Sequence, residues 1–98
     1  MADFIFLMHG DGPAETSFAD WDAYITGLSK AGVMQGGSAI GAGVTARVSG
    51  EPAPVTAAII GYIRVAADDL THARTMLAGN PVYEAGGTVE IRELPRTG

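Results

Sequence analysis

The stretch FIFLMHGDGP, residues 4–13, predicts a buried strand that ends in a turn. Five consecutive apolar residues are too few for a helix, and aromatic side chains favour strands. The glycines and the proline that follow interrupt regular structure. A second apolar run, AIIGYIRVA at residues 58–66, predicts another buried strand. Because these two strands are the most apolar of the chain, we expect them in the centre of a sheet.

Two helices are expected between and after these strands. Ser17 and Asp20 have the spacing of a capping box, which predicts a helix start. The apolar stripe behind them recurs every three or four residues: Phe18, Trp21, Ile25 and Leu28. Gly32 is expected to end this helix in the left-handed conformation. Asp68 predicts the N-cap of a second helix, which the GNP sequence at residues 79–81 ends.

The remaining segments complete a known pattern. Residues 33–35 predict a second strand, residues 36–43 a loose glycine-rich stretch, and residues 44–48 another short strand. Residues 88–94 alternate apolar and polar side chains, as a half-buried edge strand does. The order is that of a βαββαβ ferredoxin-like sandwich, an α+β fold with an antiparallel sheet and two helices on one face. We expect one domain over residues 1–98.

The composition excludes several classes of function. A chain of 98 residues supports one core and no second domain. Six basic against eleven acidic residues give a net charge of -5, which argues against a nucleic-acid partner. With no cysteine and two histidines outside any ligand spacing, neither a metal nor another cofactor is expected. Without an export signal or a membrane-length apolar run, we expect a cytoplasmic protein with no membrane partner.

Two glycine motifs match functional signatures only in part. Residues 41–46, GAGVTA, have the letters of the dinucleotide fingerprint, but no helix is expected after them. Residues 36–40, GGSAI, nearly match a nucleophile elbow, yet the closing glycine falls one place late. A flexible glycine-rich hairpin explains both stretches better.

His9 and Asp11 are the candidate catalytic residues. They lie where a central strand meets a glycine-rich turn, a place where folds expose functional groups. A histidine with a carboxylate two residues away can act as a general acid/base pair. The alternative is a histidine hydrogen-bonded at a strand end and an aspartate that supports the turn.

Four further side chains are candidates for ligand binding: Trp21, Tyr24, Tyr62 and Arg64. Trp21 and Tyr24 follow the turn closely enough to form a wall of the same cleft as His9, although core packing is the commoner role for such aromatic residues. Tyr62 and Arg64 reach the cleft from the neighbouring strand only if alternation places them on its face. Arg64 lies in an apolar strand, where a buried guanidinium needs an anionic partner.

Both central strands are apolar on both faces. Phe4 and Phe6 alternate with Ile5 and Leu7, so each face of the sheet receives large apolar side chains. The helices cover only one face, and large exposed apolar patches are rare on monomers. We therefore expect a homodimer in which a second copy of the chain covers the other face.

The chain resembles the YCII-related family, in the dimeric α/β-barrel superfamily of ferredoxin-like proteins. The resemblance is carried by residues 4–11 (FIFLMHGD), 32–37 (GVMQGG), 61–65 (GYIRV) and 80–92 (NPVYEAGGTVEIR). It implies a homodimer with a cleft between the sheet and the first helix. It also implies elimination or isomerisation chemistry on a small organic molecule by a histidine–aspartate pair. Asp11 matches the family's aspartate, whereas Trp21 stands at about the place of the family's helix histidine.

Two hypotheses of function follow. The first is a small-molecule-binding homodimer in which His9 and Asp11 act as an acid/base pair, as in an isomerase or a lyase. The alternative is a non-catalytic accessory or regulatory module that binds another protein.

Overall fold

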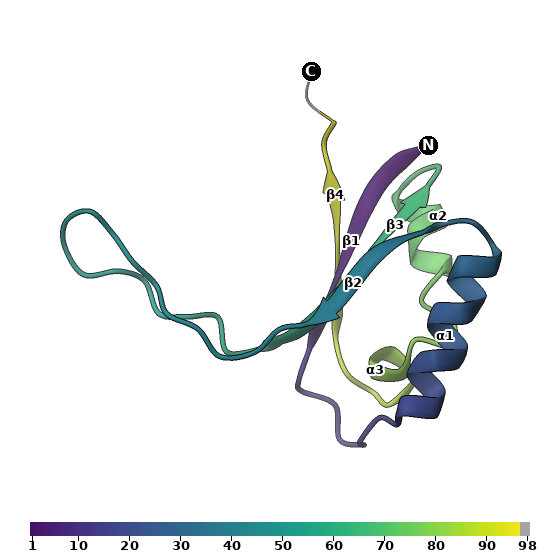
Figure 1. The fold of residues 1–98 in the computed structure, drawn as a ribbon, viewed down its shortest axis with the longest axis horizontal. Helices are drawn as coiled ribbons and strands as arrows, with labels where there is room; N and C mark the ends of the chain where they lie inside the picture. The colour runs from purple at the N-terminus through teal and green to yellow at the C-terminus, as the bar shows by residue number, and fades with distance from the viewer. Residues whose placement is uncertain (97–98) are drawn as a thin grey trace.

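The computed structural model describes residues 1–96, which form a four-stranded sheet and three helices. The elements are β1 (Ala2–His9), α1 (Phe18–Lys30), β2 (Met34–Ala39), β3 (Ile59–Ala67), α2 (Leu70–Thr75), α3 (Pro81–Glu84) and β4 (Val89–Leu94). The sheet has the order β2-β3-β1-β4 and every neighbouring pair is antiparallel (Figure 1). This α+β architecture is compatible with the predicted ferredoxin-like fold. The two apolar strands are central and the charged last strand lies at an edge, as predicted.

The core lies between one face of the sheet and the helices. In β1, Phe4 and Phe6 are fully or almost fully buried, and their cross-strand partners in β3 are Val65 and Ile63. The helices, with the turn after α2, complete the core with Tyr24, Leu28, Ala73, Leu77 and Val82. Strict alternation in β1 and β3 therefore decides which side chains the helices cover.

Helix α1 begins as predicted but presents a different face to the sheet. The Ser17 hydroxyl accepts a hydrogen bond from the Asp20 backbone N–H at 3.2 Å, and Gly32 follows the helix with a φ of 75°. Phe18 is 96% exposed, so its assignment to the buried stripe was wrong. The fully buried residues are Tyr24 and Leu28, and Phe18 lies about 100° around the helix from the middle of that pair.

Strand β2 is longer than predicted, and the strand predicted at residues 44–48 is absent. Gly36 and Gly37 belong to β2, and a side chain on Gly37 would place its Cβ 2.7 Å from the Tyr62 carbonyl oxygen. Residues 41–57 form no helix or strand and project away from the body as a long loop, here called the arm (Figure 1). The short alternation at residues 44–48 fails to form a strand because no neighbouring strand pairs with it.

The second helix starts one residue later than predicted, and a third helix follows it. Asp69, not Asp68, caps α2: its Oδ1 accepts from the His72 backbone N–H at 2.8 Å. The residues expected only to end that helix also begin α3, because the Asn80 side chain accepts from the Tyr83 N–H at 3.1 Å. Pro81 stands in the first turn, where its missing N–H costs no hydrogen bond.

The face of the sheet that the helices leave uncovered is here called the open face. Ile5 lies in its centre, with Arg64 opposite it in β3 and Arg92 opposite it in β4. The next row across the sheet contains Leu7 between its partners: Tyr62 in β3 and Glu90 in β4. The open face is therefore apolar in the middle and charged along β3 and β4.

At one end of this face, Asp3 ties three segments together. Its carboxylate accepts two hydrogen bonds from Arg96 at 2.9 Å and one from the Gln35 amide at 3.0 Å. These bonds hold the pKa of Asp3 well below its usual range. Among residues 1–96, no helix is both long and apolar enough to cross a membrane.

Phe6→Ala should lower the free energy of unfolding by about 3–5 kcal/mol, because it leaves a cavity where a side chain is now 0% exposed. Urea unfolding followed by circular dichroism measures the change. The matched control is Phe18→Ala, which should change the free energy by less than about 0.5 kcal/mol. Equal losses in the two variants would contradict this assignment of the core.

Candidate functional site

An apolar hollow of about 390 Å³ lies between α1 and the sheet. Its lining comprises Met8, Thr16, Trp21, Ile25, Met34, Gly37, Ser38, Ala39, Ile60, Gly61, Tyr62, Ile63 and Val82. Trp21 and Ile25 come from α1, and Ile63 comes from the helix-covered side of β3. This is the position that the resemblance predicted for a cleft.

A second hollow, of about 360 Å³, adjoins the first at the end of β1 and contains His9. The two hollows share three lining residues: Thr16, Ile60 and Val82. The second hollow also contains Glu15 and Gly10. The two hollows are therefore neighbours, with the apolar one beside Trp21 and the other at the end of β1 beside His9.

His9 makes its hydrogen bond to an acidic residue of β4. Its Nε2 lies 3.3 Å from Oε1 of Glu90, which also accepts from Arg92 Nη1 through Oε2 at 3.1 Å. The bond from Arg92, and after it the bond from His9, lower the pKa of Glu90. An ionised carboxylate accepts a hydrogen bond, so it favours the tautomer of His9 that carries its proton on Nε2. In that tautomer Nδ1 has the free lone pair and can accept a proton. Glu90 therefore orients the imidazole at the end of β1, on the side of the open face where Glu90 itself lies.

Asp11 supports the turn and the start of β4. Its Oδ1 accepts from the Thr88 backbone N–H at 2.8 Å, and its Oδ2 accepts from the Thr88 hydroxyl at 2.7 Å. These two bonds are the main reason that the pKa of Asp11 is lowered. Both carboxylate oxygens are thus engaged by Thr88, which is the role of an aspartate that supports a turn.

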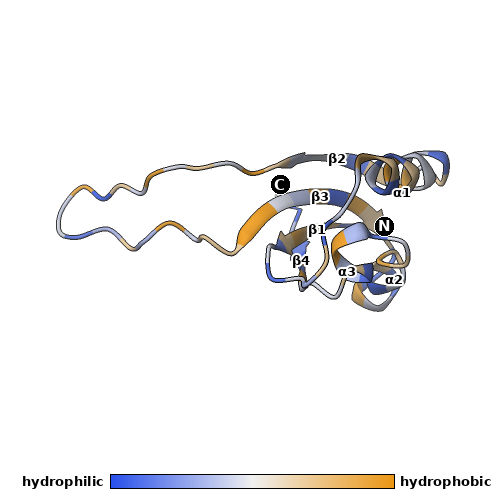
Figure 2. Cartoon of the chain, turned by 90° about the horizontal axis from the view of Figure 1, so that it is seen from below, coloured by the Kyte–Doolittle hydropathy of each residue, from blue (hydrophilic) through white to orange (hydrophobic). Residues whose placement is uncertain are grey.

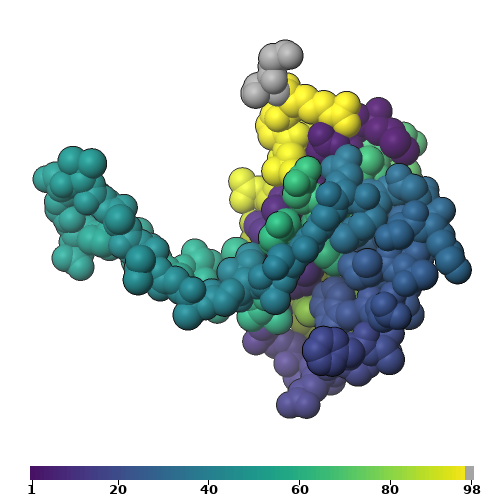
Figure 3. All heavy atoms as spheres, in the orientation of Figure 1, coloured from purple at the N-terminus to yellow at the C-terminus, as the bar shows by residue number. Residues whose placement is uncertain are grey.

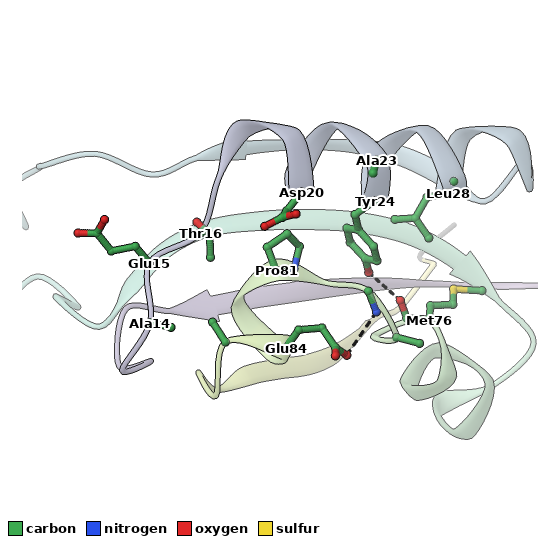
Figure 4. A pocket seen from close by; sticks show the side chains of 14 residues that line it. Ala14, Glu15, Thr16, Asp20, Ala23, Tyr24, Leu28, Met76, Pro81 and Glu84 are labelled. Carbon is green, nitrogen blue, oxygen red and sulfur yellow. Dashed lines mark hydrogen bonds between the residues drawn. The ribbon is translucent and has the colours of Figure 1, made fainter.

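The two predicted aromatic walls lie in different places. Trp21 lines the apolar hollow, and its indole N–H donates to the Thr16 hydroxyl at 3.1 Å. Tyr24 faces a wider groove of about 690 Å³ between α1, α3 and the segment at residues 76–79 (Figure 4). Its hydroxyl donates to the Met76 carbonyl at 2.7 Å, and burial raises its pKa. Tyr24 is therefore a core residue at the edge of this groove, which shares Ala14, Glu15, Thr16 and Ala85 with the hollow that contains His9.

Tyr62 and Arg64 both lie on the open face by strand alternation. Tyr62 is half-buried and also contributes to the lining of the apolar hollow. Arg64 is exposed, which corrects the expectation of a buried guanidinium with an anionic partner. The correction has a simple cause, because Arg64 alternates with Ile63 and Val65 and so points away from the helices.

Two residues of the site were not identified from the sequence. Glu90 was assigned only to a half-buried strand, and its approach to His9 depends on the register between β1 and β4. Thr16 precedes α1 as an ordinary polar residue, and only the bond from Trp21 places it in the hollow. Within residues 1–96, His, Asp and Glu side chains form no group of three suited to a metal ion.

Replacing Asp11 by Asn should destabilise the fold near neutral pH and much less in acid. A carboxylate whose pKa is lowered by folding stabilises the protein above its unfolded pKa, and this stabilisation is lost as pH falls through its folded pKa. The stability difference between the parent and Asp11→Asn should therefore shrink between about pH 6 and about pH 2. Urea unfolding at the two pH values measures it.

Thr88→Val is the companion variant, since it removes the hydroxyl donor and keeps the backbone donor. It should reproduce part of the pH effect. A stability difference that stays constant with pH in both variants would show that the bonds from Thr88 to Asp11 do not stabilise the fold.

The chain was also compared with known proteins. No protein-family model matches it, and no curated protein matches it. Its function must therefore be argued from the geometry of the site itself.

Proposed function

We propose that the protein is a homodimer of the YCII-related, dimeric α/β-barrel type that binds a small, largely apolar organic molecule and transfers a proton through His9. The observation that carries the proposal is the pair of neighbouring hollows, one apolar and the other lined by His9. An apolar cavity with a few polar groups at one end is the usual form of a small-molecule site.

The lining defines the class of ligand. Apolar contacts with Trp21, Ile25 and Met34 favour a hydrocarbon ring or a short chain. The Thr16 hydroxyl accepts a hydrogen bond from the Trp21 indole N–H. The proton of the Thr16 hydroxyl is therefore free to be donated to an oxygen of the ligand. Glu15 and Glu90 near the polar end disfavour an anion. The fitting ligand is therefore a small neutral ketone or a similar carbonyl compound.

The proposed chemistry is proton transfer at the carbon next to that carbonyl. Nδ1 of His9 takes the proton, and the electron pair of the broken C–H bond forms the enolate. The Thr16 hydroxyl stabilises the enolate oxygen by donating a hydrogen bond. Return of a proton from the imidazolium to carbon gives either the same ketone or an isomer. Glu90 stabilises the imidazolium in between, because it accepts from Nε2 at 3.3 Å.

The homodimer rests on the composition of the open face. Its central side chains, Ile5 and Leu7, are only partly covered by the chain itself. Arginines flank Ile5 across the sheet, whereas Glu90 flanks Leu7. A second copy related by a two-fold axis buries the apolar centre and can pair the opposite charges around it.

One observation favours the alternative, a non-catalytic interaction module. Asp11 is engaged entirely by Thr88, so the predicted histidine–aspartate pair is replaced by His9 with Glu90. A histidine that is hydrogen-bonded at a strand end needs no catalytic role. Binding and proton transfer are therefore tested separately.

Cyclohexanone in D₂O is the probe, because it combines an apolar ring with one carbonyl. In the parent protein it should shift the NMR signals of Trp21 and His9 and should exchange its α-protons for deuterium. Ile25→Trp fills the apolar hollow and should weaken binding at least about ten-fold, since a fully occupied cavity excludes the ring. His9→Gln should keep the binding shifts and lose the exchange.

The matched control is Ala23→Trp, which adds the same side chain to the same helix at a residue that lines the groove beside Tyr24 and not the apolar hollow. It should bind and exchange like the parent. Exchange that persists in His9→Gln would remove the catalytic role, and binding that persists in Ile25→Trp would place the ligand elsewhere.

A further inference from the structure

The arm, residues 41–57, stands clear of the rest of the described chain (Figure 3). It contains no strand pairing, and its side chains are exposed almost throughout. Val44 is 93% exposed and Val48 is fully exposed, while Ile40 and Val55 near its two ends are about half exposed. Figure 2 shows apolar segments along the arm, and Figure 3 shows it standing clear of the body.

Two measures of size show that the chain alone is not compact. Its radius of gyration is 14.8 Å, against about 13 Å for a compact domain of this length. Its accessible surface is 6508 Å², against about 5,300 Å² for a folded monomer of this mass. The excess, of the order of 1,200 Å², exceeds the area of about 800 Å² that each partner commonly contributes to a stable interface.

The arm has some local order of its own. The Arg47 guanidinium donates to the Glu51 carbonyl at 3.0 Å across the tip, and Gly50 provides a positive φ of 82° between them. This turn brings the two halves of the arm alongside each other, as Figure 1 shows. An arm with a defined turn and exposed apolar residues resembles an element prepared to pack against another surface more than a solvated linker.

The direction of the arm identifies the surface. It leaves the sheet on the side away from α1, α2 and α3, which is the side of the open face (Figures 1 and 2). Ile60, beside the root of the arm, alternates with Tyr62 onto the same face and is 46% exposed. The arm and the open face thus lie on the same side of the sheet, where a single partner can cover both (Figures 1 and 2).

We propose that the arm of each copy packs against the body of the second copy, which at the same time covers the open face. This inference rests on the homodimer of the proposed function and adds a reciprocal exchange of arms to it. Charge supports the choice of a second copy. Arg47 and Glu51 are the only charged residues of the arm, so it is neutral, whereas the chain carries -5. A neutral arm packs against an acidic copy without adding repulsion.

The chain has no cysteine, which makes a selective experiment possible. A nitroxide is attached to Val48→Cys in unlabelled protein, and this is mixed with an equal amount of ¹⁵N-labelled parent protein. In mixed dimers the nitroxide should broaden amide signals of the labelled copy. The control label is Leu70→Cys, on an exposed position of α2 that the proposal leaves outside the interface. It should cause at least about five-fold less broadening, given the steep distance dependence of the effect.

Light scattering on the same samples separates the possible failures. A dimer with broadening from Val48→Cys and little from Leu70→Cys supports the exchange of arms. A dimer without broadening from Val48→Cys, or with equal broadening from both labels, overturns it and leaves the homodimer standing. A monomer at micromolar concentration overturns the homodimer as well. Ligand binding by cyclohexanone is measured independently of all three outcomes.

Discussion

The pairing of β1 with β3 is the contact on which the rest of the structure depends. Both strands are apolar on both faces, and alternation sends Phe6 and Ile63 to one face and Leu7 and Tyr62 to the other. The helices bury the first face within the chain. The second face stays partly exposed, and its burial requires atoms that the chain does not supply. The helix-covered face thus explains the stability of the fold, whereas the open face explains the proposed homodimer.

Much of the fold was predictable because its signals are local. Two apolar runs, a capping box at Ser17 and a glycine at position 32 specify the central strands and α1. The errors arose where tertiary contacts decide the outcome. Phe18 matched the helical period but lies outside the buried stripe, which the sheet fixes around Tyr24 and Leu28. The alternation at residues 44–48 lacks a neighbouring strand, and strand pairing is never a property of one segment.

The sequence indicated where His9 lies in the fold, but not which residue forms a hydrogen bond with it. A histidine at the end of a central strand, followed by a glycine-rich turn, indicated a place where the structure has a hollow lined by His9. Its hydrogen-bond partner could not be inferred from spacing, because Glu90 reaches His9 through the register of β4 from 81 residues away. Asp11 is nearer in sequence but is held by Thr88. Glu90, and not Asp11, is therefore the carboxylate that accepts the hydrogen bond from His9. The proposed role of His9 needs such a carboxylate, and Glu90 provides it.

The central claim is that a second copy covers the open face. The most direct measurement is the broadening of methyl NMR signals by a soluble nitroxide, recorded where light scattering reports twice the chain mass. Ile5 and Leu7 on the open face should be protected as well as Ile63, which is 3% exposed within the chain itself. Leu70, which is 55% exposed on α2, should broaden strongly. If Ile5 and Leu7 broaden as much as Leu70 does, the open face is bare in solution and the claim is wrong.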